Sequence, residues 1–509
     1  MGARKIKRVL VANRGEIAVR VMRTCHERGI ETVAVYSEPD RHALHTRYAH
    51  RAEAIGPAAS RDSYLRMDRI LDAARKHGAD AIHPGYGFLS EKQEFARACQ
   101  DAGIIFIGPP ASAIEAMGEK TQARARMKAA GVPVVPGTDG PVDDATAMAF
   151  ARQVGLPVMV KAAAGGGGKG MRKVTRDEDL ANAVSGARRE ALNAFGDDSL
   201  YVEKFLEKPR HVEIQVFADS HGNVHHLFER ECSIQRRNQK IIEEAPSAVV
   251  TPEMRRAMGE VAVKGARAVG YLNAGTMEFL VDANKKFYFL EMNTRLQVEH
   301  PVTEWVTGFD LVGAQLDVAE GLKLPWGEQP ESPRGWAMEA RIYAEDPAQN
   351  FLPQPGRIVD LKVPGGLGVR DDGGVYAGYE VTPFYDPMIA KLSCWAGNRQ
   401  AVIDKLIRAL QEYTVKGITT NIAYLVRILQ HPAFRAGDYD TGFIEKYLQV
   451  PPPPPPEHLT QAALLAAAYW REAEDARARA KVVGTSGGAT SGGQAGMSNW
   501  QRAFAPGGR

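Results

Sequence analysis

The sequence of 509 residues is 44% apolar and 25% charged, with a formal net charge of +3. A chain of this length is expected to form more than one domain, and a charge so near zero argues against nucleic acid as a partner. No apolar run is long enough to cross a bilayer, and the cysteines form no CxxC pair, so the sequence predicts no membrane span, zinc site or disulfide framework.

The N-terminal part alternates between short apolar strands and helices, which predicts a βαβ domain with a parallel sheet. Arg8–Ala12 is typical of a buried strand, a helix follows to about Arg28, and Glu31–Tyr36 is typical of the next strand. The connecting Asn13-Arg-Gly15 is not the GxGxxG fingerprint, which argues against a nicotinamide cofactor. The first strand follows Met1 without a leader, and with unpaired cysteines this predicts a cytoplasmic protein.

A loop rich in glycine follows the predicted strand Ala81–His83, where open α/β sheets place ligands. We interpret His83 as a hydrogen-bond partner that holds this loop, rather than as a catalyst. The domain is expected to close near Pro109, and a helix that carries Lys120 follows.

A run of glycines follows the predicted strand Leu156–Lys161. Glycine leaves the backbone amides free to wrap phosphate oxygens. The Walker pattern fails here because Gly170, rather than serine or threonine, follows Lys169. We therefore interpret the run as a mobile flap over phosphates and not as a P-loop; a flexible linker is the alternative.

Two further segments suggest a site. Tyr201–Leu206 is typical of a strand that ends in a hinge, and its backbone could bind an adenine edge. The run Glu231–Lys240 is densely polar and lies between strand-like segments, so a functional site and a solvated surface are both open.

The strands Gly275–Val281 and Lys286–Leu290 are separated by turn residues, which predicts a hairpin. If the chain turns at Asn284-Lys285, Glu278 lies opposite Glu291. Two carboxylates about 4 Å apart repel each other by roughly 4 kcal/mol at an effective dielectric constant of 20, so they need a cation between them. Oxygen ligands suit Mg²⁺, which commonly accompanies nucleotide phosphates.

The stretch from Glu291 to Pro301 carries polar residues at every second position. In an extended chain these side chains would share one face. That face would present Glu291, Asn293, Arg295, Gln297 and Glu299. A solvated strand face is the alternative.

Several of these motifs together resemble biotin carboxylases, the ATP-grasp enzymes of biotin-dependent carboxylases. The resemblance is carried by Lys161 with its glycine flap, Glu203-Lys-Phe-Leu206, Gln235–Pro246, Glu291–Pro301 and Arg341–Pro347, and it extends from about Lys5 to Tyr447. It implies an α/β protein with an N-terminal βαβ domain over 1–115, an ATP-grasp domain over 116–335 and a mixed α/β C-terminal domain over 336–447. The glycine-flap lid would span about 133–205.

The resemblance also implies a role for each matching residue. ATP would be held by Lys120, Lys161, Gly167, Gly168, Glu203, Lys204, Leu206, His211 and Gln235. Magnesium or manganese would be held by Glu278, Glu291 and Asn293. Bicarbonate would be bound by Lys240, Arg295, Gln297 and the Val298 backbone. Glu299 would be the general base, and Arg341 would stabilise the biotin enolate. Asn238 departs from the family pattern, since many members have histidine there, and we expect altered nucleotide affinity rather than lost chemistry.

The implied reaction is ATP- and bicarbonate-dependent carboxylation of biotin through carboxyphosphate. No Met-Lys-Met carrier motif occurs in a hairpin context, so we expect biotin on a separate carrier protein, a separate carboxyltransferase chain, and a homodimer of this chain. The acceptor would be acetyl-CoA or another acyl-CoA, with pyruvate or another 2-oxo acid as the alternative. An alternative of another class is a non-catalytic, nucleotide-binding scaffold.

Beyond Arg341 the sequence predicts a strand-rich segment and a helix over 398–413. Residues 448–509 are expected to form a proline-rich spacer, a helix over 459–483 and a Gly/Ser tail. Trp500 and Phe504 near its end suggest a docking peptide, with a disordered tail as the alternative.

Overall fold

The computed structural model describes residues 4–138, 140–163, 170–449 and 457–484. The chain forms two compact units, Met1–Gln449 and Val450–Arg509. The second unit contributes helix α16, Glu457–Gly484, which bears out the helix predicted there. Gly167, Gly168, the proline-rich spacer and the aromatic residues of the tail lie outside the described residues, so their predicted roles stay predictions.

The N-terminal part is a parallel five-stranded sheet with strand order β3-β2-β1-β4-β5, which confirms the predicted βαβ arrangement. Its strands are β1 Arg8–Val11, β2 Glu31–Ser37, β3 Arg51–Gly56, β4 Ala81–His83 and β5 Ile105–Phe106. Its helices are α1 Gly15–Glu27, α2 Leu44–Tyr48, α3 Met67–His77 and α4 Gln93–Asp101. His83 holds the following loop as predicted, because its Nδ1 accepts a hydrogen bond from the Gly85 N–H at 3.0 Å.

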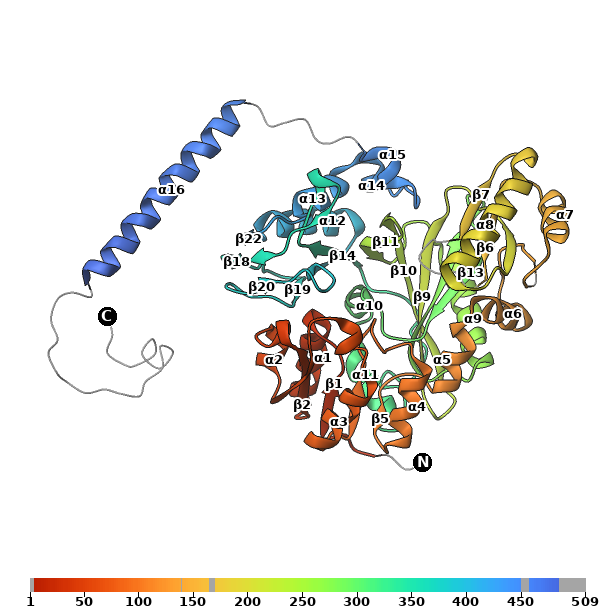
Figure 1. The fold of residues 1–509 in the computed structure, drawn as a ribbon, viewed down its shortest axis with the longest axis horizontal. Coiled ribbons are helices and arrows are strands. Elements are labelled where there is room, and N and C mark those ends of the chain that lie inside the picture. Colours follow the sequence, from red (N-terminus) through yellow and green to blue (C-terminus); the bar gives the residue numbers. More distant parts are fainter. Residues whose placement is uncertain (1–3, 139, 164–169, 450–456, 485–509) are drawn as a thin grey trace. The chain divides into compact units, whose positions relative to one another are not determined.

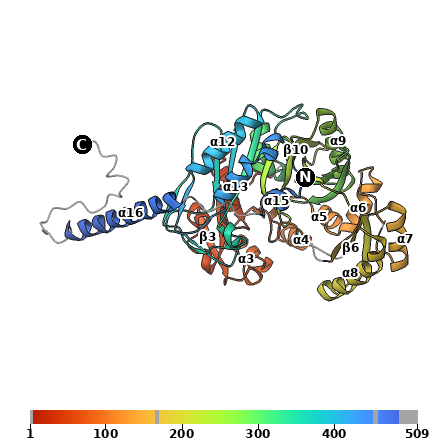
Figure 2. The ribbon, with the colours of Figure 1, turned by 90° about the horizontal axis from the view of Figure 1, so that it is seen from above.

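Helices α5 Ala111–Gly118 and α6 Lys120–Ala129 lead to a three-stranded sheet, which belongs to a substructure that we call the lid. The lid consists of α7 Asp144–Val154, β6 Val158–Ala162, β7 Met171–Val174, α8 Leu180–Phe195 and β8 Leu200–Lys204. Figures 1 and 2 both show it as a lobe at one side of the first unit. Val158, Val160 and Val202 are buried in its own small core.

An eight-stranded sheet with order β13-β12-β9-β10-β11-β14-β21-β19 forms the centre of the first unit. Its strands are β9 Arg210–Ala218, β10 Val224–Arg236, β11 Gln239–Ala245, β12 Asn273–Val281, β13 Phe287–Asn293, β14 Trp336–Tyr343, β19 Val369–Gly373 and β21 Met388–Ala396. The sheet continues from the predicted ATP-grasp domain into the predicted C-terminal domain through the β11–β14 pair. Side chains from both regions therefore share one surface.

Helices flank the eight-stranded sheet and complete the first unit. They are α9 Pro252–Ala268, α10 His300–Thr307, α11 Leu311–Ala319, α12 Arg399–Glu412, α13 Ile422–Gln430, α14 Pro432–Ala436 and α15 Phe443–Tyr447. Short strands β15 Glu345–Asp346, β16 Leu352–Pro353, β17 Gly356–Arg357, β18 Asp360–Lys362, β20 Glu380–Val381 and β22 Thr414–Lys416 form small two-stranded pairings. Helix α12 begins after Asn398, whose side chain accepts a hydrogen bond from the Ala401 N–H, as a helix cap does.

The predicted hairpin is present, and Glu278 lies opposite Glu291 as predicted. The turn is not where the sequence placed it, however. The Asp282 N–H donates to the Lys286 carbonyl, which centres the turn on Asn284. A bulge then leaves Leu290 without a partner and restores the predicted pairing.

The extended chain predicted for Glu291–Glu299 is wrong beyond Asn293. Strand β13 ends at Asn293, and the chain then turns until Glu299 becomes the N-cap of α10. Strand alternation cannot govern side chains in a turn, so any common direction of Arg295, Gln297 and Glu299 has to arise from this turn.

Among the helices that the structure describes, none combines the length and apolar character needed to span a bilayer.

Candidate active site

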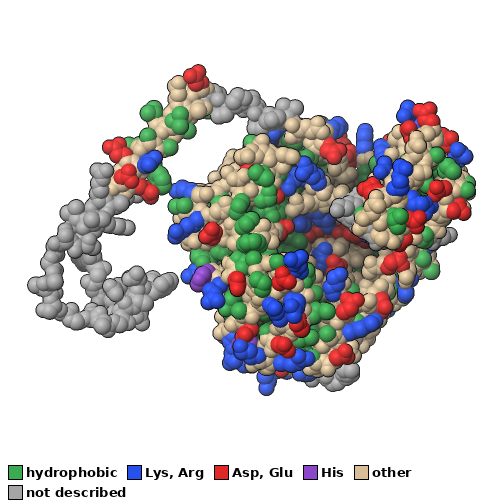
Figure 3. Space-filling model, viewed as in Figure 1, with side chains coloured by type: hydrophobic (Ala, Val, Ile, Leu, Met, Phe, Trp, Pro, Cys, Tyr) green, Lys and Arg blue, Asp and Glu red, His purple; other side chains and the backbone are tan. Residues whose placement is uncertain are grey.

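Lys240 is the centre of a largely buried cluster of charges on the eight-stranded sheet. Its ammonium donates to Glu213 Oε2 at 2.6 Å, Glu278 Oε1 at 2.9 Å and Glu299 Oε1 at 2.7 Å. Glu213 on β9 lies opposite Glu278 on β12, Lys240 lies near the start of β11, two strands away from β9, and Glu299 directly precedes α10. Figure 3 shows that this face of the first unit is hollowed and that acidic and basic side chains gather in the hollow.

Glu299 is wholly buried and lies between two cations. Its Oε1 accepts from Lys240, and its Oε2 accepts from Arg341 Nη2 at 2.9 Å. Burial alone would raise the pKa of the Glu299 carboxyl, but the charges of Lys240, Arg341 and Arg230 hold this pKa well below its ordinary value. Glu299 is therefore an ionised carboxylate in the resting protein.

Arg341 on β14 is held by a second buried carboxylate. Its Nε donates to Glu243 Oε1 at 2.6 Å, while its Nη2 reaches Glu299. Burial raises the pKa of Glu243 to about 7 despite the neighbouring guanidinium. The planar guanidinium thus has a fixed orientation, which a lysine at this position could not reproduce.

Glu278 is joined to the predicted nucleotide residue His211 on β9. His211 Nε2 lies 2.8 Å from Glu278 Oε2, and Gln235 Nε2 lies 2.5 Å from His211 Nδ1. Burial would raise the pKa of the Glu278 carboxyl, but Lys240 and His211 hold it well below its ordinary value. The structure therefore places three predicted site residues, Gln235, His211 and Glu278, in one chain of contacts.

The turn after β13 holds the predicted bicarbonate residues through its own side chains. Arg295 donates from Nη2 to Asn293 Oδ1 at 3.0 Å and from Nη1 to Gln297 Oε1 at 2.8 Å. Asn293 and Gln297 in turn donate to Glu278 Oε1 at 2.8 and 3.3 Å. The polar residues of this stretch thus meet at the cluster, although the chain that carries them is not a strand.

The predicted nucleotide residues of the lid form a separate group. Lys161 on β6 lies 2.5 Å from Glu203 Oε2 on β8, and Arg124 Nη1 lies 3.1 Å from Glu203 Oε1. Lys204 donates to the Gly155 and Leu156 carbonyls at 2.9 and 3.0 Å. Leu206 lies just beyond the end of β8 and is half-buried. The partner of Lys161 in this structure is therefore a carboxylate.

Glu291 and Lys120 lie at the more open side of the hairpin. Their side chains approach to 3.5 Å and are 41% and 49% exposed. Glu278, the partner of Glu291 in the strand register, is only 4% exposed. Carboxylate oxygens from Glu278 and Glu291 and an amide oxygen from Asn293 are the donor types that Mg²⁺ prefers, so these residues fit a magnesium ion.

Asn238 lies in the tight turn between β10 and β11, with φ of 66° next to Arg237 with φ of 49°. Asparagine tolerates this left-handed conformation better than most residues do. Gln235–Lys240 is thus the end of a hairpin, in which Lys240 contacts the charge cluster and the turn residues are more exposed. A functional site over Glu231–Lys240 stays a prediction.

Three carboxylates that contact the charged residues of this cluster are not among the site residues predicted from the sequence. Glu213 pairs with Arg230 at 2.5 Å, Glu243 holds Arg341, and Glu91 accepts from Arg295 Nε at 3.1 Å. Alternation from His211 places Glu213 on the same face of β9, so it could have been found. Glu91 and Glu243 come from other segments of the chain, and only the tertiary structure brings them here.

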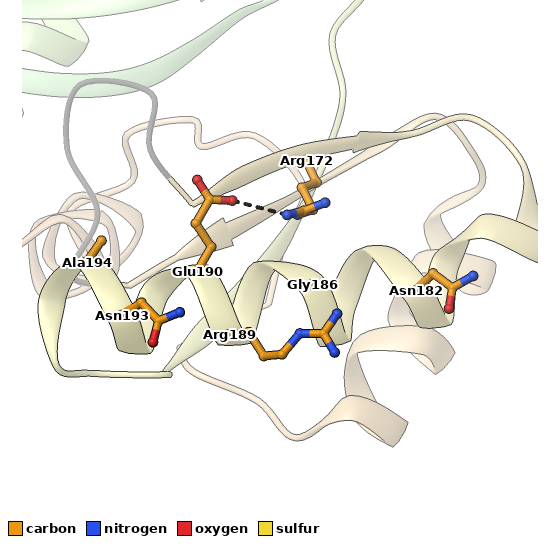
Figure 4. A pocket seen from close by; sticks show the side chains of 7 residues that line it. All are labelled: Arg172, Asn182, Gly186, Arg189, Glu190, Asn193 and Ala194. Carbon is orange, nitrogen blue, oxygen red and sulfur yellow. Dashed lines mark hydrogen bonds and ion pairs between the residues drawn. The ribbon is translucent and has the colours of Figure 1, made fainter.

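A shallow pocket on the lid has a different character. It is lined by Arg172, Asn182, Gly186, Arg189, Glu190, Asn193 and Ala194, and Arg172 is paired with Glu190 at 3.2 Å (Figure 4). As far as the described residues go, this lining includes no residue of the charge cluster around Lys240. All four cysteines, Cys25, Cys99, Cys232 and Cys394, are free and buried.

Three family models match most of the chain. Residues 5–114 match the model for the biotin carboxylase N-terminal domain. Residues 119–326 match the carbamoyl-phosphate synthase L chain ATP-binding domain, and residues 339–446 match the biotin carboxylase C-terminal domain.

Individual relatives agree with the family models. The chain is 54% identical to a pyruvate carboxylase subunit of Methanothermobacter thermautotrophicus over 86% of this chain and 90% of the relative. It is 51% identical to biotin carboxylase 1 of Bacillus subtilis over 87% of this chain and 99% of the relative. A solved biotin carboxylase domain dimer of Hydrogenobacter thermophilus 2-oxoglutarate carboxylase, in complex with MgADP, ADP and bicarbonate, has a TM-score of 0.82. It is 48% identical and covers 87% of this chain and 98% of its own.

Proposed function

The chain belongs to the biotin carboxylase family, and from that premise we propose that the charge cluster around Lys240 is its catalytic centre. The enzyme carboxylates biotin with ATP and bicarbonate, which is the first half-reaction of a biotin-dependent carboxylase. The observation that carries the site proposal is the position of the buried Glu299 carboxylate between Lys240 and Arg341. A non-catalytic scaffold would have no use for such a base.

Bicarbonate binds, in our proposal, at Lys240, Arg295, Gln297 and the Val298 amide. The incoming anion competes with Glu299 for the Lys240 ammonium, so the pKa of Glu299 rises as this cation turns to the substrate. Glu299 then accepts the bicarbonate proton, and the freed oxygen attacks the γ-phosphorus of ATP to give carboxyphosphate and ADP. The buried position of Glu299 keeps water from competing for this proton transfer.

Carboxyphosphate then breaks down to CO₂ and phosphate, and the phosphate accepts the proton of the biotin ureido nitrogen. The biotin enolate that results carries negative charge on its ureido oxygen. Arg341, held in orientation by Glu243, is placed to stabilise that charge. The enolate nitrogen attacks CO₂, which gives carboxybiotin.

The nucleotide is held in our proposal by Lys120, Lys161, Glu203, Lys204, Leu206, His211 and Gln235, together with Gly167 and Gly168 of the flap. Glu278, Glu291 and Asn293 would hold magnesium, which neutralises phosphate charge when bound. The Lys161–Glu203 pair supports this assignment, because a phosphate could replace the carboxylate as the partner of Lys161. Lys204 is held by loop carbonyls and so helps to fix the adenine-side end of β8.

The partners follow from the half-reaction. We infer a biotin carboxyl carrier protein and a carboxyltransferase on other chains, because one relative matched over 90% of its length is named as a carboxylase subunit. Another, matched over 99% of its length, is named as a biotin carboxylase. The solved relative named as a domain dimer supports a homodimer. A cytoplasmic location stays a prediction.

The acceptor of the carboxyl group is, in our proposal, an acyl-CoA or a 2-oxo acid. Relatives of similar identity are named for pyruvate and for 2-oxoglutarate, so the carboxyltransferase must choose the acceptor. Acyl-CoA remains our first choice and pyruvate the second. Co-purification of the transferase, followed by carboxylation assays with acetyl-CoA, propionyl-CoA and pyruvate, would separate them.

The test of the site uses the pure chain with ATP, Mg²⁺, bicarbonate and free biotin. ADP release that depends on both biotin and bicarbonate supports the proposal. Nucleotide binding without such turnover would contradict it and favour the scaffold.

A further inference from the structure

Lys391 on β21 is a lysine with no exposed side-chain surface. Lysine is almost never fully buried unless its charge is paired, because removing an ammonium from water is costly. Its Nζ donates to the backbone carbonyl of Val298 at 2.7 Å. Val298 is the residue next to Glu299, so this buried cation touches the loop that carries the proposed base.

Carboxylates near Lys391 keep it charged, and one of them forms a long ion pair with it. Glu16 on α1 lies 3.4 Å away, and Asp372 lies opposite Lys391 in the strand register. Burial would lower the pKa of Lys391, but Glu16, Glu339 and Asp372 outweigh burial and raise it. Lys391 is therefore an ammonium at neutral pH.

The short hydrogen bond of Lys391 goes to the loop and not to a countercharge. Both carboxylate oxygens of Glu16 are buried and have no hydrogen-bond partner among the described residues. An ion pair built for stability would place the ammonium against a carboxylate oxygen at hydrogen-bond distance. In this structure the oxygen that lies at hydrogen-bond distance from the Lys391 ammonium is the carbonyl oxygen of Val298.

Holding one carbonyl fixes more than one atom, because the peptide group is planar. The Val298 carbonyl and the Glu299 nitrogen belong to the same peptide plane. By holding this plane, Lys391 orients the backbone from which the Glu299 side chain extends. The preceding peptide plane is also held, because His300 Nδ1 lies 2.8 Å from the Gln297 carbonyl oxygen. That plane carries the Val298 N–H, which points away from the Gln297 carbonyl in a trans peptide.

We propose that Lys391 is a positioning residue that holds the loop Gln297–Glu299 so that the Val298 amide and the Glu299 carboxylate face bicarbonate. This inference rests on the proposed function, since it concerns the same bicarbonate site. Lys391 is not among the residues that we propose to bind substrate. It joins the C-terminal strand β21 to the bicarbonate loop and, through Glu16, to the N-terminal helix α1.

The test compares Lys391→Met with Glu16→Gln in the free-biotin assay. Lys391→Met keeps the length of the side chain but removes the donor, and Glu16→Gln alters the countercharge while leaving the bond to Val298. We expect Lys391→Met to raise the KM for bicarbonate by about tenfold or more, the effect typical of a lost charged hydrogen bond. The KM for ATP should not change, and Glu16→Gln should leave both KM values unchanged.

Each outcome decides the question. A folded Lys391→Met with an unchanged KM for bicarbonate, or with equal rises in the KM for ATP and bicarbonate, overturns the inference. If Lys391→Met does not fold, the double variant Lys391→Met/Glu16→Gln, which also removes the countercharge, gives the same measurement. If neither folds while Glu16→Gln does, Lys391 serves stability and the inference is wrong. Absence of biotin-dependent turnover in the wild type would instead contradict the proposed function.

Discussion

Arg341 Nη2 and Glu299 Oε2 lie 2.9 Å apart, and neither side chain has appreciable contact with solvent. The proposed base and the proposed enolate cation therefore neutralise each other in the resting enzyme. In the proposed mechanism, bicarbonate competes with Glu299 for Lys240, and the biotin enolate then competes with Glu299 for Arg341.

The first prediction concerns the base. Glu299→Gln should reduce biotin-dependent ADP release by about 10²–10⁴-fold, because the amide cannot accept the bicarbonate proton. Binding of ADP with Mg²⁺ should persist. Glu299→Asp keeps the charge but shortens the side chain, and it should recover part of the rate. Near-normal turnover in Glu299→Gln would show that another group is the base.

The second prediction distinguishes the two proposed metal ligands. Glu278→Gln should lower the stability of the ligand-free protein by about 1–3 kcal/mol, because buried Lys240 and His211 lose a charged partner. Glu291→Gln should leave that stability unchanged, because its side chain is 41% exposed. Both variants should need more Mg²⁺ for half-maximal turnover. Thermal unfolding and Mg²⁺ titration measure the two effects, and an unchanged Mg²⁺ requirement would remove these residues from the metal site.

The third prediction concerns Arg341. Arg341→Lys keeps a positive charge but cannot bond Glu243 and Glu299 together through one rigid plane. Biotin-dependent turnover should fall by about 10²–10³-fold, as for loss of an oxyanion stabiliser. ATP hydrolysis that needs bicarbonate but not biotin should fall much less. Equal losses in the two rates would place Arg341 in bicarbonate activation instead.

The fourth prediction concerns the pH dependence of stability. Burial raises the pKa of Glu16 from 4.5 to about 7. Between these values the folded protein holds a proton that the unfolded chain has released, so wild-type stability falls as pH rises through this window. Glu16→Gln mimics the protonated form. It should match the wild type near pH 4.5 and be more stable above pH 7 by about 1–3 kcal/mol in urea unfolding.

Glu304→Gln is the matched control for this pH effect and should show the opposite trend. Burial would raise the pKa of Glu304, but Arg20 and Arg370 lower it. Its charge therefore stabilises the fold above the ordinary carboxyl pKa, and this contribution is lost as pH falls through the lowered value. The variant should be less stable than the wild type at neutral pH and approach it in acid. A pH-independent difference for Glu16→Gln would mean that this carboxyl keeps its ordinary pKa.

The fifth prediction concerns the second unit. A chain that ends at Gln449 should fold and carboxylate free biotin like the full chain, because the first unit, Met1–Gln449, is compact by itself. The match to 99% of biotin carboxylase 1 over 87% of this chain supports this expectation. Melting temperature and free-biotin turnover check it. A loss of either would make the second unit part of the catalytic fold.

The hairpin shows how far the sequence could predict the site. Turn residues and alternation correctly placed Glu278 opposite Glu291, but the turn is centred on Asn284 rather than between Asn284 and Lys285, and the bulge at Leu290 compensates for this. Neither difference has a local cause in the sequence, because a bulge depends on how the strand packs. The pairing was right although one of its assumptions was not.

The stretch after Asn293 shows the opposite case. Alternation suggested a strand, and the chain turns instead, yet Gln297 and Glu299 still reach the cluster around Lys240. Glu91 and Glu243 could not be found locally, because their partners Arg295 and Arg341 lie 204 and 98 positions away along the chain. Long-range partners of this kind are fixed by the tertiary fold, whereas strand and helix positions follow from local periodicity.

The shared eight-stranded sheet has a consequence for hybrids between this enzyme and its relatives. A crossover between α10 and β14 would join Glu299 from one parent to Arg341 and Lys391 from the other. In such a hybrid, the hydrogen bonds Arg341–Glu299 and Lys391–Val298 would each join residues from two different parent enzymes. Such exchanges can preserve catalysis only where both parents carry the same residues at these positions, so a safe crossover lies after α15 rather than at the border of the matched domains.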